Sequence, residues 1–257
     1  MQFISQTTTD GVAERLFNLD GIPGVLWTPG GADDDRPLVL LAHGGGQHKK
    51  APGVVARAHR FVTNCGFAVV AIDAPGHGDR PKTEQHQRFV AVLRERIAAG
   101  EPAGPLVARD NAERAAQAVP EWQAVLDAVG ESDGVGVAGP AGLWGVSLGA
   151  AIGVRLAAAE PRITAAVFGL AGDDLLTEAA AQVTVPVQFL LQWDDELVPR
   201  EAGLALFDAF ASRDKTLHAN PGPHAGVPAF EMDSAECFFT RHLGRTGVTA
   251  APDCPGV

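Results

Sequence analysis

Residues 143–151 read LWGVSLGAA and contain the pattern Gly-x-Ser-x-Gly, with Ser147 between Gly145 and Gly149. An apolar run precedes the pattern and a run rich in Ala and Gly follows it, which predicts a buried strand, a tight turn and a closely packed helix. Such a turn exposes the serine hydroxyl and leaves the next backbone N–H, that of Leu148, facing a developing oxyanion. Because Gly, Ser and Ala are common, the bare pattern can arise by chance, so the flanking elements carry the argument.

Short apolar runs alternate with helical stretches along most of the chain. Buried strands are predicted at residues 37–42, 67–72, 163–170, 185–192 and 216–219, and helices at 53–64, 201–210 and 230–243. Residues 3–28 contain two alternating runs joined by Asp20-Gly21, which predicts an antiparallel hairpin at the sheet edge. The fold class is therefore α/β, with a mostly parallel central sheet flanked by helices.

The length of 257 residues suits one large domain, which we expect over residues 1–244. Residues 81–120 interrupt the strand–helix rhythm and predict a small helical insertion over the carboxyl ends of the strands. Ligands of such sheets bind at that end, so the insertion is expected to form one wall of a substrate pocket. Residues 245–257 are rich in Gly, Pro and small residues, which is typical of a flexible tail.

Net charge and cysteine content indicate which classes of partner and which cellular compartment the chain is suited to. A net charge of −11 argues against nucleic acid and against an anionic membrane surface. Residues 142–159 are weakly polar but carry Arg155 and several glycines, which favours a buried strand and helix over a membrane span. Cys65, Cys237 and Cys254 form neither a disulfide framework nor a metal spacing, and the N-terminus lacks a signal-peptide pattern. These features predict a cytoplasmic location.

The run at 37–42 ends in His43-Gly44-Gly45-Gly46. Glycines after a buried strand let backbone N–H groups approach a ligand closely, which predicts a second set of oxyanion donors from Gly45 and Gly46. His43 is expected to brace this loop, and His48 is expected either to line the pocket mouth or to lie on the surface.

A serine nucleophile needs a base, and the base needs an orienting acceptor. Three adjacent acids, Asp194, Asp195 and Glu196, follow the strand at 185–192, and the residues alone do not choose among them. His224 lies in a Pro/Gly loop after the last strand, where a side chain can reach the turn at Ser147. His218 within that strand and His242 in the closing helix are expected to have packed or surface roles.

Two further patterns are set aside. Gly134, Gly136 and Gly139 spell G-x-G-x-x-G, but a helix precedes them and a strand follows, the reverse of a dinucleotide site. Asp73, His77 and Asp79 share one tight loop, but no further ligand cluster supports a metal there. We expect neither a metal nor an organic cofactor.

Five motifs occur in one order along the chain: H-G-G-G, A-P-G-H-G-D, G-V-S-L-G, D-x-x-V-P and a late histidine. This order resembles the α/β-hydrolase superfamily, near its dienelactone-hydrolase-like and small carboxylesterase branch. The resemblance implies an α/β-hydrolase fold and selects Asp195, the first residue of D-x-x-V-P, as the acid. Asp194 is then the fallback, and Asp173 and Asp174 are remote ones. Dienelactone hydrolases use cysteine where this chain has Ser147, a difference that favours ordinary ester hydrolysis.

The resemblance implies a serine hydrolase that cleaves small or medium carboxylic esters through an acyl-enzyme, with Ser147, His224 and Asp195 as the triad. The alternatives are a lactonase, thioesterase, amidase or acyltransferase with the same triad, and a non-catalytic small-molecule receptor on the same fold. Substrate contacts are expected from His48, Trp144, Trp193 and Phe89, although core packing explains most of them equally well. The expected partner is a small-molecule ester, and a homodimer stays open.

Overall fold

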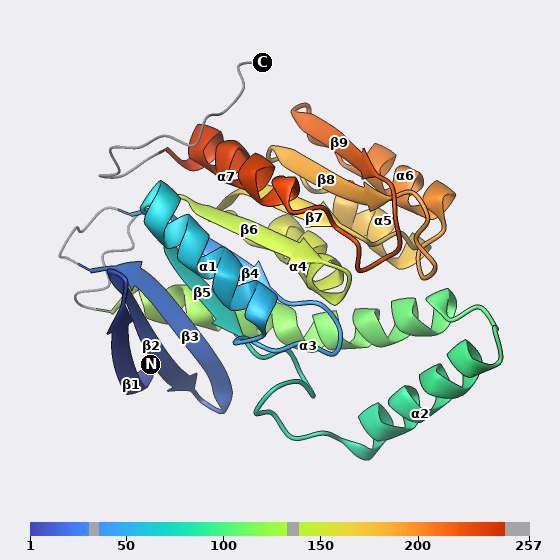
Figure 1. Ribbon diagram of the computed structural model, residues 1–257, viewed down its shortest axis with the longest axis horizontal. Coiled ribbons are helices and arrows are strands. Elements are labelled where there is room, and N and C mark those ends of the chain that lie inside the picture. Colours follow the sequence, from blue (N-terminus) through green and yellow to red (C-terminus); the bar gives the residue numbers. More distant parts are fainter. Residues whose placement is uncertain (31–35, 133–138, 245–257) are drawn as a thin grey trace.

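We describe a computed structural model of the chain over residues 1–30, 36–132 and 139–244. The described residues form a nine-stranded sheet in the order β1-β2-β3-β5-β4-β6-β7-β8-β9 (Figure 1). Its strands are β1 (Gln2–Thr9), β2 (Val12–Leu19), β3 (Ile22–Pro29), β4 (Leu38–Ala42), β5 (Ala68–Ile72), β6 (Ala141–Val146), β7 (Ile163–Gly169), β8 (Val187–Gln192) and β9 (Lys215–Asn220). The six strands β4 to β9 pair in parallel, as predicted.

The N-terminal part of the sheet is an antiparallel meander of three strands. The sequence predicted two strands and one hairpin, whereas Asp10-Gly11 makes a second turn of the same kind as Asp20-Gly21. All four residues have positive φ, between 49° and 88°. Two successive positive-φ residues form the turn that matches the twist of a two-residue hairpin, and Asp-Gly favours it. The same dipeptide therefore produced both turns.

Helices cover both faces of the sheet (Figure 1). They are α1 (Pro52–Cys65), α2 (Glu84–Ala98), α3 (Gly104–Gly130), α4 (Leu148–Ala159), α5 (Asp174–Ala180), α6 (Arg200–Ala209) and α7 (Phe230–Leu243). Helices α1 and α7 pack on one face of the sheet in one hydrophobic cluster. Helices α3, α4, α5 and α6 pack on the other face in a second cluster. Strands β5 and β6 lie on opposite sides of β4, so the direction in which successive strands are added reverses at β4. Ligands in open α/β sheets bind at the carboxyl ends of the strands at such a point, here those of β4 and β6.

The predicted helical insertion consists of α2 and the first part of α3, which begins at Gly104 with Pro105 in its first turn. Helix α2 lies alongside α3, away from the sheet (Figure 1). Its first turn is capped by Thr83, whose hydroxyl accepts the N–H of His86.

Cys237 on α7 is disulfide-bonded, whereas the sequence analysis found no disulfide framework. Disulfides are rare in the cytoplasm, so the cysteines no longer support that location, which stays a prediction. No described helix has the length and apolar character that crossing a membrane requires. Gly134, Gly136 and the predicted tail lie outside the described residues.

Candidate active site

Ser147 forms the turn between β6, which ends at Val146, and α4, which begins at Leu148. Its backbone has φ 56° and ψ −119°, a strained conformation for a residue with a side chain. The Ser147 N–H donates to the Gly169 carbonyl at the end of β7, at 3.0 Å, which holds the turn against the neighbouring strand. The predicted strand, turn and helix around Ser147 are confirmed.

The glycines on either side of Ser147 are required by close backbone contacts. A Cβ atom at Gly149 would lie 2.1 Å from the Ala42 carbonyl oxygen, and one at Gly145 would lie 2.3 Å from the Gly149 carbonyl oxygen. Because the opposing atoms are backbone, they cannot move aside cheaply. The two glycines therefore allow helix α4, strand β6 and the end of β4 to meet around Ser147.

His224 connects Ser147 to Asp195. The Ser147 Oγ lies 3.1 Å from His224 Nε2, and His224 Nδ1 lies 2.7 Å from Asp195 Oδ2. The Asp195 side chain is 3% exposed and that of His224 is 13% exposed, so the relay is largely shielded from water. Of the acids that the sequence left open, Asp195 is the one that binds this imidazole.

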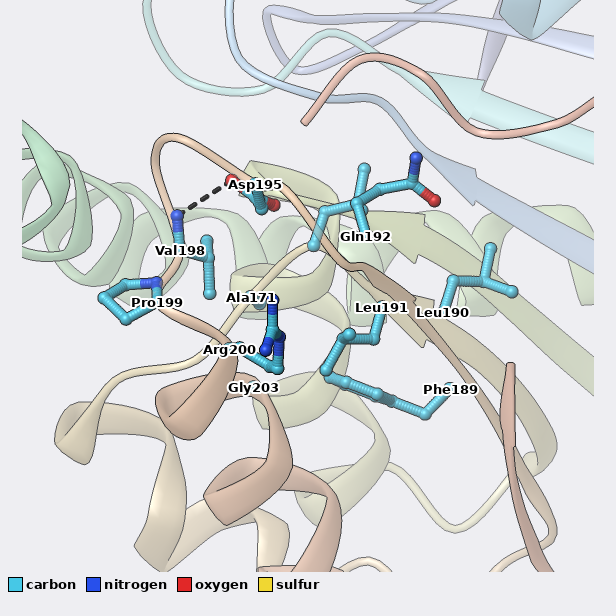
Figure 2. Close-up of a pocket in the computed structure, with 11 residues that line it drawn as sticks. Ala171, Phe189, Leu190, Leu191, Gln192, Asp195, Val198, Pro199, Arg200 and Gly203 are labelled. Atoms are coloured by element: carbon cyan, nitrogen blue, oxygen red, sulfur yellow. Dashed lines mark hydrogen bonds between the residues drawn. The ribbon is translucent and has the colours of Figure 1, made fainter. Parts of the chain in front are cut away.

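Asp195 is held by the backbone that follows it. Its Oδ1 accepts the N–H groups of Leu197 and Val198 at 2.8 and 2.9 Å, and Figure 2 shows the bond from Val198. Burial works against ionisation, but the bonds from His224 and from these N–H groups outweigh it and hold the pKa of Asp195 below its ordinary value. Asp195 is thus ionised and oriented toward His224.

The neighbouring acids bind the loop that carries His224. Asp194 exchanges two hydrogen bonds with Gly222, each 3.1 Å long, and Glu196 accepts the His224 backbone N–H at 2.9 Å. Gln192, which the sequence analysis did not single out, donates to the Pro223 carbonyl. Asp194, the fallback acid, therefore supports the histidine loop.

The other two histidines that were considered contact different parts of the chain. His218 on β9 lies 2.8 Å from Glu231, and His242 on α7 lies 3.8 Å from Asp214. Both contacts fit the packed or surface roles expected for them.

The glycine loop after β4 adjoins the turn at Ser147. A Cβ atom at Gly44 would lie 3.7 Å from the Val146 carbonyl oxygen, and Gly45 and Gly46 are exposed beyond it. Leu148 is the first residue of α4, and N–H groups in a first helical turn lack partners within the helix. The loop that carries Gly45 and Gly46 therefore adjoins the residue before Ser147, and Leu148 directly follows Ser147.

His43 braces the beginning of this loop. Its Nε2 accepts the Ala74 N–H at 3.0 Å, and its Nδ1 donates to the Gly44 carbonyl at 2.9 Å. This pattern fits a neutral ring with the proton on Nδ1. Burial of the 2% exposed ring lowers the pKa of His43 from 6.5 to about 4, so the ring stays neutral near pH 7.

A buried lysine, Lys49, ends the same loop and was missed by the sequence analysis. Its ammonium group lies 2.7 Å from Asp73 and 2.6 Å from Asp79. Burial alone would lower the pKa of Lys49, but its hydrogen bonds to these two carboxylates raise it above the ordinary value. The acids of the loop after β5, which were weighed as metal ligands, bind this lysine. The available signal was a lysine three residues after the glycine run, at the end of the same loop.

A cavity of about 560 Å³ opens beside Ser147 and His224. Residues 102–111 form one wall, and the loops after β7 and β8 form others. Most lining side chains are apolar, among them Ala103, Val107, Leu170, Leu175, Leu197 and Val198. Asp173 and Asp174, the remote alternatives for the triad acid, lie in the wall contributed by the loop after β7 and the start of α5.

The two tryptophans expected in the pocket lie elsewhere. Trp144 packs in the cluster of α1 and α7, with the Arg57 guanidinium 3.6 Å from its ring centre. Trp193 is exposed, and the Arg200 guanidinium lies over it, 3.8 Å from its ring centre. Neither lines the cavity at Ser147, because Trp144 is buried on the α1 and α7 face of the sheet and Trp193 is exposed to solvent.

Phe89 and His48 are also outside this cavity. Phe89 stacks on His86 within α2, with ring centres 6.4 Å apart. His48 is exposed and accepts the Lys50 N–H, which is the surface role that the sequence left open. The expected wall is formed by the residues just before α3 and by its first turns, whereas α2 contributes no lining residue and contacts α3.

Comparison with solved structures identifies relatives over nearly the whole chain. A cold-adapted esterase from an Arctic intertidal metagenomic library is 36% identical, with a TM-score of 0.75 and coverage of 95% of this chain and 100% of that one. An acetyl xylan esterase from Paenibacillus sp. R4 shares the fold at 15% identity (TM-score 0.64; coverage 94% and 88%). The protein Est1E from Butyrivibrio proteoclasticus, with bound ferulic acid, shares it at 19% identity (TM-score 0.64; coverage 88% and 98%).

No protein-family profile and no curated protein sequence matches the chain. The identity to the Arctic esterase nevertheless extends over that whole protein, and the two folds agree. The chain belongs to the α/β-hydrolase family of serine esterases.

Proposed function

We propose that the chain hydrolyses carboxylic esters through an acyl-enzyme formed on Ser147, with His224 as the base and Asp195 as the acid that orients it. The observation that supports this most directly is the hydrogen-bonded relay of these three side chains at the edge of a cavity of about 560 Å³. Membership of an esterase family supports the same reaction class.

In the first half-reaction His224 Nε2 takes the proton of the Ser147 hydroxyl as the oxygen attacks the ester carbonyl. The bond from Nδ1 to Asp195 fixes the ring orientation and stabilises the imidazolium that forms. His224 then gives the proton to the leaving alcohol, and the acyl group stays on Ser147.

Backbone donors hold the negative oxygen of the tetrahedral intermediate. We assign these donors to the N–H of Leu148 and to the N–H of Gly45, with Gly46 next to it. Loss of one such donor typically costs about 10²–10³-fold in rate. In the second half-reaction His224 activates a water molecule, and the same donors stabilise the second intermediate before the acid leaves.

The substrate is a small or medium ester. The cavity volume lies within the range of about 300–1,000 Å³ that is usual for small-molecule sites, and its mostly apolar lining suits a hydrocarbon acyl or alcohol group. Lactones, thioesters and amides also present a carbonyl that the same triad can attack, so a lactonase, thioesterase or amidase is the alternative. An acyltransferase would instead pass the acyl group to an added alcohol and form a new ester.

The test is hydrolysis of p-nitrophenyl esters from acetate to dodecanoate by the wild type and Ser147→Ala. We expect the variant to lose about 10³-fold or more of kcat, because no other side chain takes the place of the nucleophile. Ser132→Ala serves as the matched control, since Ser132 bonds the Ala128 carbonyl at the end of α3. The chain-length optimum measures the acyl pocket.

A fluorophosphonate label separates the outcomes if the wild type cleaves none of these esters. Labelling of the wild type with none of Ser147→Ala indicates an active triad with a different acyl substrate. No labelling of either protein contradicts the proposed function and leaves a receptor role.

A further inference from the structure

The glycine loop after β4 is attached at both ends to one short segment after β5. At its beginning, the His43 ring accepts the Ala74 N–H. At its end, Lys49 binds Asp73, through its ammonium group and also through its backbone N–H, which donates to Asp73 Oδ1 at 2.8 Å. Asp73 and Ala74 are neighbours, so both ends of the loop are fixed to the same point.

The residues between these two attachments carry the proposed oxyanion donors. Residues 44–48 include three glycines, and residues 45–48 are exposed. Exposed glycines have no side chains with which to fix their own position, and Gly46 has a positive φ of 72°. The Gln47 N–H donates to the Gly44 carbonyl at 3.2 Å and closes a turn around Gly45 and Gly46, and the two ends place this turn relative to Ser147.

At the Lys49 end of the loop, a buried ammonium group is paired with a buried carboxylate. Lys49 is 6% exposed and Asp73 is fully buried, so water screens their attraction little. Asp73 Oδ2 also accepts the Asp79 N–H at 2.9 Å. A Cβ atom at Gly78 would lie 2.2 Å from the Asp73 carboxylate, so the loop after β5 is shaped around this group.

We propose that Lys49 is a positioning residue for the oxyanion hole: by its ion pair with Asp73, it holds the Gly45 and Gly46 N–H groups at the distance from Ser147 at which they bind the oxyanion. The proposal rests on the proposed function and extends it to a residue that does not touch the substrate. Donors act only within about 2.7–3.1 Å of the oxyanion, and a displacement of about 1 Å can cost about 10²-fold.

Lys50 is the matched control, because it is adjacent in sequence and differs in burial. Its ammonium group pairs with Glu14 on β2 at the protein surface, and its side chain is 39% exposed. A surface pair of this kind contributes little to stability. Lys49→Met and Lys50→Met therefore remove the same charge from neighbouring positions with different consequences.

The experiment compares kcat and KM of both variants on a p-nitrophenyl ester and on the matching thionoester. Sulfur accepts hydrogen bonds weakly, so an intact oxyanion hole favours the oxygen ester, and a displaced hole loses part of this preference. For Lys49→Met we expect kcat on the oxygen ester to fall about 10–100-fold, KM to change by less than about threefold and the ester-to-thionoester rate ratio to fall. Lys50→Met should keep wild-type values of all three.

Lys49→Met leaves the Asp73 carboxylate buried without its ammonium partner, which can unfold the protein. The double variant Lys49→Met with Asp73→Asn removes both charges, and it decides the question wherever the single variant does not fold by circular dichroism. A folded variant with wild-type kcat and a wild-type ester-to-thionoester ratio overturns the proposal. Wild-type hydrolysis that depends on Ser147 preserves the proposed function whichever result is obtained.

Discussion

Helix α4, which begins next to Ser147, and helix α2, which lies outside the cavity, are held in opposite ways. Helix α4 has eight buried residues among its twelve, whereas none of the fifteen residues of α2, all of them described, is buried. Helix α4 packs on α3 and on the strands that surround Ser147, while α2 contacts α3 through polar side chains such as Gln85 and His86. The reacting atoms thus lie on a packed element.

This difference separates the chemistry from the outer part of the cavity. The relay and the glycine loop depend on close backbone contacts and buried charges, which tolerate little change. The wall at residues 102–111 is preceded by an exposed helix that can be altered without loss of core packing. Substitutions should therefore have large effects at the sheet and small effects on α2.

The largest expected effect is that of Asp195→Asn. The amide cannot stabilise the imidazolium and favours the wrong histidine tautomer, so we expect kcat to fall about 10⁴-fold. Asp194→Asn changes only the side-chain group that accepts the Gly222 N–H, so kcat should fall no more than about tenfold. Steady-state kinetics on one ester measures both, and equal losses would refute the assignment of Asp195.

Gly149→Ala tests the close packing on the α4 side. The new methyl group would lie 2.1 Å from the Ala42 carbonyl oxygen, and we expect the free energy of unfolding to fall by about 3 kcal/mol. Gly53→Ala in α1 is the control, because nothing lies within 4 Å of a Cβ there. Urea denaturation of the two variants should differ clearly, and similar midpoints would show that the backbones separate easily.

The buried ring of His43 predicts a pH dependence of stability. Its pKa in the folded protein is about 4, below the ordinary 6.5, so the unfolded chain binds the proton first as the pH falls. The stabilising contribution is complete above pH 6.5 and declines between pH 6.5 and about 4, by at most about 1.4 kcal/mol per pH unit. Over this interval the unfolding free energy of His43→Gln should fall less steeply than that of the wild type. Parallel curves would contradict a neutral, buried His43.

The smallest expected effect is that of Phe89→Ala on α2. Phe89 is only partly buried, so its removal should lower the free energy of unfolding by less than about 1 kcal/mol. The same substitution at Phe61 on α1, a fully buried residue, should cost about 3–5 kcal/mol. Thermal unfolding of both variants makes the comparison. A large loss at Phe89 would show that α2 is covered by something other than α3.

The sequence by itself determined those features that depend on neighbours in the chain. The turn at Ser147 follows from its two glycines, the strands follow from continuous apolar runs, and the hairpins follow from Asp-Gly. One of the two Asp-Gly turns was overlooked, although its signal was equally local. The choice of Asp195 over its neighbours needed the family resemblance, because three adjacent acids give the same local pattern.

Only the tertiary structure decided which distant side chains meet. The ion pair of Lys49 with Asp73 spans 24 residues, and the bond from Glu196 to the His224 backbone spans 28. Nothing in the local pattern of either residue predicts its partner. Trp144 and Phe89 were expected to meet in the pocket and do not. An aromatic side chain fits a core, a surface stack or a pocket equally well, so the sequence alone does not place it. The packing of the whole chain decides among these environments, because burial is shared among elements that are remote in sequence.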